Sequence, residues 1–80
     1  MEVCAPLAIV VTNVQSSDYV VIVEPWATEY RLAPGATLHL TEKDGDPTES
    51  IEVHLGDNVA TFFARRGGIV TVYQDGVELP

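Results

Sequence analysis

The chain has 80 residues, 46% of them hydrophobic, which suffices for one domain around one core. Its twelve acidic and four basic residues give a net charge of −8, which repels phosphate backbones and anionic lipid surfaces. We therefore expect a single domain over residues 1–80, with neither nucleic acid nor a membrane as partner and too little core for an enclosed catalytic cavity. The acidic excess is either a solvated surface or a face for a basic partner or cation.

The first residues carry one cysteine and no targeting signal that we can identify. Cys4 is the sole cysteine, so no internal disulfide is possible, and no nearby charge activates its thiol. The segment before Pro6 lacks the basic start of a signal peptide, and the apolar run after it is too short to span a membrane. A cytoplasmic protein with an inert thiol is the expectation.

The apolar pattern predicts an all-β fold. Val, Ile, Thr and aromatic residues recur in short runs separated by turn residues, and helical periodicity is nearly absent. This spacing is typical of a small antiparallel β-sandwich of seven or eight short strands, of Greek-key or jelly-roll type, with a closed β-barrel as the alternative. The predicted strands are 7–14, 19–24, 28–32, 36–41, 51–55, 59–64, 69–74 and 77–79.

The turn residues predict how some strands connect. Strands 7–14 and 19–24 are expected to form one hairpin, and strands 36–41 and 51–55 could form another around the polar segment 42–50. We expect that segment to be an exposed loop and the most mobile part of the chain. Asp75-Gly76 predicts a type I′ turn that joins the last two strands.

The stretch Glu24-Pro25-Trp26 is the first candidate site. Pro25 has no N–H to donate and ends strand pairing, so Trp26 falls where the chain leaves a sheet. The indole either plugs one end of the sandwich core or forms an aromatic platform for a sugar, a peptide or a protein partner. In the second interpretation Glu24 is the polar anchor and Tyr30 lies beside it.

The same stretch carries a family resemblance. Glu24-Pro25-Trp26, Tyr30 and the Pro34-Gly35 turn resemble a group of small uncharacterised bacterial proteins with a Glu-Pro-Trp-Gly signature, and Asp75-Gly76 followed by Glu78-Leu79 is similar to their usual ending. The resemblance implies an all-β fold and no established activity. The chain departs from the signature at Ala27, where the group has glycine.

Two histidines form the second candidate site. If strands 36–41 and 51–55 pair, His39 lies across from His54, and Glu52 shares the face of His54. These three side chains could then hold Zn²⁺ or Ni²⁺ in a cupin-like small barrel. The alternative is two exposed histidines on a polar face, and no cofactor at all. Asp44-Gly45-Asp46 followed by Glu49 is a poor match to a calcium loop, because Pro47 interrupts it.

Arg65-Arg66-Gly67-Gly68 is the single basic cluster, which is either a charged turn or a site for an anion or an acidic partner. No nucleophile elbow, phosphate loop or catalytic triad is present. We therefore predict a non-enzymatic, acidic binding or interaction module. Its partner is another protein or a second copy, since strands this apolar leave edges and faces exposed. The residues expected to bind are Trp26, Tyr30, Glu24, Arg65 and Arg66.

Overall fold

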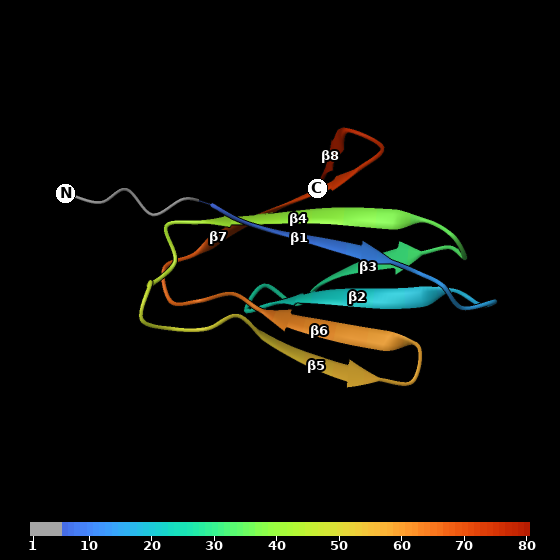
Figure 1. Cartoon of the computed structure of the whole chain (residues 1–80), viewed down its shortest axis with the longest axis horizontal. Coiled ribbons are helices and arrows are strands. Elements are labelled where there is room, and N and C mark those ends of the chain that lie inside the picture. Colours follow the sequence, from blue (N-terminus) through green and yellow to red (C-terminus); the bar gives the residue numbers. More distant parts are fainter. Residues whose placement is uncertain (1–5) are drawn as a thin grey trace.

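The computed structural model describes residues 6–80 and contains two four-stranded sheets stacked face to face (Figure 1). Cys4 lies outside the described residues. The predicted β-sandwich is confirmed, and the described strands do not close into the alternative barrel. The strands are β1 (Leu7–Thr12), β2 (Tyr19–Glu24), β3 (Thr28–Leu32), β4 (Thr37–Lys43), β5 (Glu52–Gly56), β6 (Val59–Phe63), β7 (Ile69–Gln74) and β8 (Val77–Leu79).

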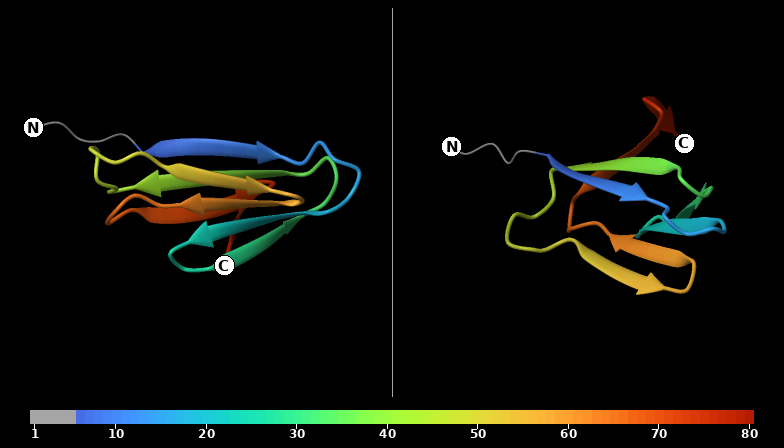
Figure 2. Two further views of the ribbon diagram at one scale, coloured as in Figure 1. Left: turned by 90° about the horizontal axis from the view of Figure 1, so that it is seen from below. Right: turned by 45° about the vertical axis from the view of Figure 1, so that its right-hand side comes forward.

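The first sheet has the strand order β1-β4-β7-β8, and the second has the order β3-β2-β6-β5. All neighbours pair antiparallel except β2 and β6, which run parallel. Strands β1 and β5 border one flank of the sandwich, and β3 and β8 border the opposite flank (Figure 2). Within the described part of the chain, no helix is long and apolar enough to cross a membrane.

The predicted hairpin of the first two strands does not form, and neither does the pairing considered for strands 36–41 and 51–55. Strand β1 pairs with β4 and not with β2, while β2 pairs with β3 and β6 in the other sheet. Likewise β4 and β5 lie in different sheets. Adjacent strands pair in most proteins, but here the segments 13–18 and 44–51 carry the chain from one sheet to the other.

Asn13 lies at the start of the first of these crossing segments and holds it in place. Its side chain is 3% exposed, and its Nδ2 donates hydrogen bonds to the carbonyls of Ser17 and Leu32, each at 2.9 Å. Its Oδ1 accepts a bond of 2.9 Å from the backbone N–H of Gln15. A buried amide is stabilising only when its polar atoms find partners, and these bonds fix the turn against the second sheet.

The core lies between the two sheets, on the inward side of the alternating strands. Leu32, Leu38 and Val21 are fully buried, and each contributes roughly 1.5–3 kcal/mol through the burial of its side chain. Leu40 of β4 lies on the same inward face as Leu38 and is 4% exposed. The remaining buried apolar residues are Val23, Ala60, Phe62 and Val72.

The last turn also agrees with the prediction. Asp75 has a φ of 54° and Gly76 a φ of 79°, the two positive angles that a type I′ hairpin requires. This turn joins β7 to the three-residue strand β8.

Candidate functional site

The loop between β6 and β7 is tied to β4 through a buried ion pair. Glu42 is 3% exposed, and its Oε1 accepts a hydrogen bond of 2.7 Å from Nε of Arg65. Its Oε2 accepts another of 2.7 Å from the backbone N–H of Arg65, whose side chain is 10% exposed. Arg65 is therefore neutralised inside the fold by a carboxylate 23 positions away in the sequence.

Two glycines make room for this ion pair. A Cβ on Gly68 would lie 2.8 Å from Cδ of Glu42, and a Cβ on Gly45 would lie 2.8 Å from Nε of Arg65. Both distances are far shorter than a van der Waals contact, so larger residues would push the carboxylate and the guanidinium apart.

Arg66 is also paired within the chain. Its backbone N–H donates a bond of 2.7 Å to Oε1 of Glu49, and its guanidinium lies 3.4 Å from Oε2 of the same residue. Asp46 is held in turn, since its N–H donates to the carbonyl of Arg66 at 2.9 Å. The segment 42–50 is thus docked against residues 65–68, and the prediction that it is entirely an exposed loop is wrong.

The carboxylate of Asp46 is occupied locally. Its Oδ1 accepts hydrogen bonds from the hydroxyl of Thr48 at 2.6 Å and from the N–H of Thr48 at 2.9 Å. These bonds favour the charged form and lower the pKa of Asp46 below its ordinary value. Such pairing stabilises the loop without any ion.

An open groove with a volume of ≈ 580 Å³ lies beside this docked loop. It brings together four of the five predicted binding residues, Glu24, Trp26, Arg65 and Arg66. We call it the Trp26 groove, and it is lined by Glu24, Pro25, Trp26, Phe63, Ala64, Arg65, Arg66, Gly67 and Gly68.

Trp26 is 50% exposed, so its ring does not plug the core. It follows a cis Glu24–Pro25 peptide bond, and it lines a second groove on its other side, of ≈ 480 Å³. The fifth predicted residue, Tyr30, lines that second groove, where its hydroxyl donates a bond of 3.0 Å to the carbonyl of Pro80. Burial raises the pKa of Tyr30.

Glu24 differs from the other charged residues of the groove. Its Oε1 is buried and has no hydrogen-bond partner among the described residues. An unpaired buried carboxylate oxygen is costly, because it has lost water without gaining a donor. A ligand that supplies a donor or a positive charge at this atom would remove that cost.

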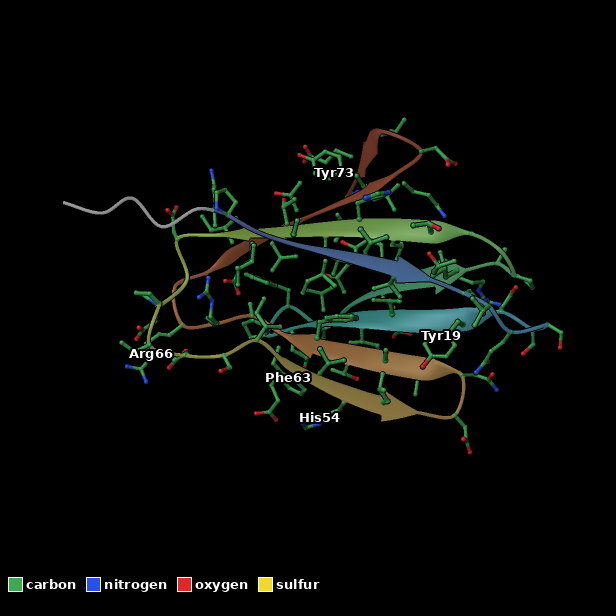
Figure 3. All side chains as sticks on the ribbon, viewed as in Figure 1. Tyr19, His54, Phe63, Arg66 and Tyr73 are labelled. Carbon is green, nitrogen blue, oxygen red and sulfur yellow. The ribbon has the colours of Figure 1, made fainter. Side chains whose placement is uncertain are left out.

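Glu24 also begins a row of side chains on the outer face of the second sheet, which we call the acidic row. Phe63 pairs with Glu24 of β2 on one side and with Glu52 of β5 on the other, so all three share one face. His54 packs on Phe63 at 4.7 Å between ring centroids and hydrogen-bonds to Glu52 (Figure 3). An aromatic ring between two carboxylates is suited to a cation.

Comparison with models of protein families, with curated proteins and with solved structures found no match to this chain. The site is therefore interpreted from its geometry alone.

The predicted pairing of His39 with His54 is wrong. His39 lies between Val10 and Tyr73 in the first sheet, and His54 lies beside Thr61 in the second. The alternation of each strand turns both imidazoles outward, with the core between them. Residues 6–80 contain no group of three or more His, Cys, Asp or Glu side chains that could hold a metal ion. Of the predicted ligand set, only Glu52 and His54 come together.

Sequence reasoning missed Phe63 and Glu42. The sequence placed Phe63 in a predicted strand but indicated no binding role for it, because its neighbours Glu24 and Glu52 come from two other strands. A charged residue after an apolar strand is ordinarily exposed, so Glu42 gave no signal of burial. The one signal near this pair was the basic cluster Arg65-Arg66-Gly67-Gly68, because arginines in so acidic a chain can pair with its own carboxylates.

Proposed function

We propose that this chain is a protein-binding module that recognises a lysine or arginine side chain of a partner in the Trp26 groove. The observation that supports this most directly is the unpaired, buried Oε1 of Glu24 beside the half-exposed ring of Trp26. The attraction between a cation and the face of an indole contributes roughly 0.5–2 kcal/mol to binding. A carboxylate that contacts the same cation adds a charge-assisted hydrogen bond.

The charges favour a cation over an anion. Arg65 is bound by Glu42 and Arg66 by Glu49, so neither guanidinium needs a further partner. The charges of these two ion pairs and of Glu24 add up to −1, and the net charge of the whole chain is −8. A basic partner is therefore attracted to the whole molecule and is then held at the buried, unpaired oxygen of Glu24.

The shape favours a peptide segment over a small amine. The acidic row extends the site from Glu24 across Phe63 to Glu52, which lies two strands away at about 10 Å for a strand spacing of roughly 4.8 Å. A segment with two basic residues would place one at Trp26 and the other at Phe63. This recognition needs no cofactor and involves no catalytic step.

The test is titration with a short acetylated peptide that carries two lysines, with a peptide carrying two glutamates as the comparison. We expect the lysine peptide to shift the indole N–H resonance of Trp26, to change its fluorescence and to bind more weakly as salt is added. Glu24→Gln should weaken binding roughly tenfold, equivalent to 1.4 kcal/mol. The matched control is Glu29→Gln, which removes the same charge from an exposed position on β3.

Two results would overturn the proposal. One is equal binding of both peptides. The other is an equal loss in the two variants, which would mean that the peptide responds to net charge and not to the groove.

A further inference from the structure

Strand β1 forms one border of the first sheet and differs from the other border strands. Among the described border strands, β3 carries Glu29 and Arg31, β5 carries Glu52, and the short β8 carries Glu78. Strand β1 has the sequence Leu-Ala-Ile-Val-Val-Thr, with no charge, no proline and six residues. Charges, prolines and shortness are what protect free edges from pairing with another strand, and β1 has none of them.

The backbone of β1 presents a regular set of groups at this edge. The N–H of Asn13 donates to the carbonyl of Ala36 at 3.0 Å, and its carbonyl accepts from the N–H of Gly35 at 2.8 Å, so the backbone groups of Asn13 point toward the β4 side. Because the direction of these groups alternates along a strand, the N–H and C=O groups of Ala8, Val10 and Thr12 point away from β4. No described strand forms backbone hydrogen bonds with this edge of β1.

These three residues are arranged symmetrically about Val10. A second β1 that runs antiparallel with Val10 opposite Val10 places Ala8 opposite Thr12, so every outward backbone group finds a partner, about six bonds in all. The same register matches the side-chain faces, since Ile9 and Val11, which pack against the core, then oppose one another across the junction. The register centred on Val10 thus pairs the outward backbone groups and also keeps the core-facing side chains of both copies on the same side of the joined sheet.

Strands β1 and β5 border the same flank of the sandwich (Figure 2), and several of the exposed apolar side chains lie on or beside these two strands. Val10 is 59% exposed, Val14 after β1 is 89% exposed, and Leu55 of β5 is 78% exposed. Val14 and Leu55 line one open groove of ≈ 270 Å³ between the edges of the two sheets. Leu55 shares the inward face with its buried neighbour Ala60, but it lies at the open flank and is therefore exposed.

We propose that this flank binds a second copy of the chain, through antiparallel pairing of β1 with β1 on a two-fold axis at Val10. A second copy fits this edge because the register centred on Val10 gives all three outward residues of β1 a partner on the other β1. An uncharged edge also offers no attraction to the basic partners that a chain of −8 otherwise selects. The first sheets join into one, and each groove at Leu55 comes to lie beside the start of β1 of the other copy.

The test is the mass in solution, measured by light scattering from micromolar to millimolar protein. Wild type should reach twice the chain mass of 8.7 kDa, whereas Val10→Lys should remain at the chain mass. The matched control is Val77→Lys, because Val77 is 62% exposed but lies on β8 at the opposite flank, and this variant should dimerise like wild type. Added salt should strengthen the dimer, since it screens two like-charged chains, and this is the opposite of its effect on the lysine peptide.

Hydrogen exchange gives a second measurement that needs no variant. The amides of Ala8, Val10 and Thr12 should be protected in concentrated wild type and should exchange freely on dilution. A wild type that stays at 8.7 kDa throughout would overturn the proposal, as would a dimer that survives Val10→Lys or that Val77→Lys dissolves equally. None of these outcomes depends on peptide binding at the Trp26 groove.

Discussion

The buried pair of Glu42 and Arg65 gives the sharpest prediction for stability. Glu42→Gln keeps the shape of the side chain but puts an amide NH₂ against one of two donors, either Nε or the backbone N–H of Arg65, which now lie 2.7 Å from the carboxylate. The guanidinium, 10% exposed, is left without a counter-charge. Removing one member of a buried ion pair costs about 3–5 kcal/mol, and we expect about 3 because the amide oxygen retains one bond.

A loss of about 3 kcal/mol is a large share of the free energy of unfolding of so small a domain. The free energy of unfolding of a domain of 80 residues is roughly 4–12 kcal/mol. Glu42→Gln should therefore lower the urea midpoint strongly and the melting temperature by about 12–24 °C. The measurement is urea unfolding with the slope compared between variants. Glu49→Gln is the matched control, because its partner Arg66 is 82% exposed at the side chain and a surface pair contributes below about 1 kcal/mol.

A double variant separates the ion pair from mere packing. Glu42→Leu together with Arg65→Met replaces both charges with apolar groups, and such replacements are often neutral, so this variant should be more stable than Glu42→Gln alone. A loss below about 1 kcal/mol for Glu42→Gln, or a double variant as unstable as the single one, would refute the reasoning.

Four further predictions concern single residues. Asn13→Ala should lower the free energy of unfolding by about 1–3 kcal/mol, since it leaves the carbonyl of Leu32 and the N–H of Gln15 without partners, and urea unfolding measures this loss. Ala27→Gly should raise that free energy by up to about 1 kcal/mol, because Ala27 has a φ of 56°, where a Cβ is strained; an unchanged or lower midpoint would contradict this. The fluorescence of Trp26, which is 50% exposed, should be quenched readily by acrylamide in the free protein, and a blue-shifted, unquenched emission would refute an open groove. The raised pKa of Tyr30 means that the folded state holds its proton more tightly, so stability is intact below pH 10.0 and falls as the pH rises above it; Tyr30→Phe should remove this part of the decline.

The sequence alone determined the secondary structure and the local turns of this protein. Alternating β-branched runs fix strands through side-chain geometry that depends on neighbours one and two residues away, and Asp75-Gly76 fixes its turn through two positive φ angles. The same local logic led us to Glu24 and Trp26, because a proline between them ends strand pairing whatever the rest of the chain does.

Only the tertiary structure decided which strands pair and which charges meet. The expected hairpins failed because pairing depends on where the whole chain crosses between sheets, and the crossing at Asn13 depends on a buried bond to Leu32, 19 residues away. The partners of Arg65, Arg66 and Phe63 likewise come from other strands and loops. A carboxylate such as Glu42 is buried only because a guanidinium distant in sequence meets it, and no pattern of neighbouring residues records such an encounter.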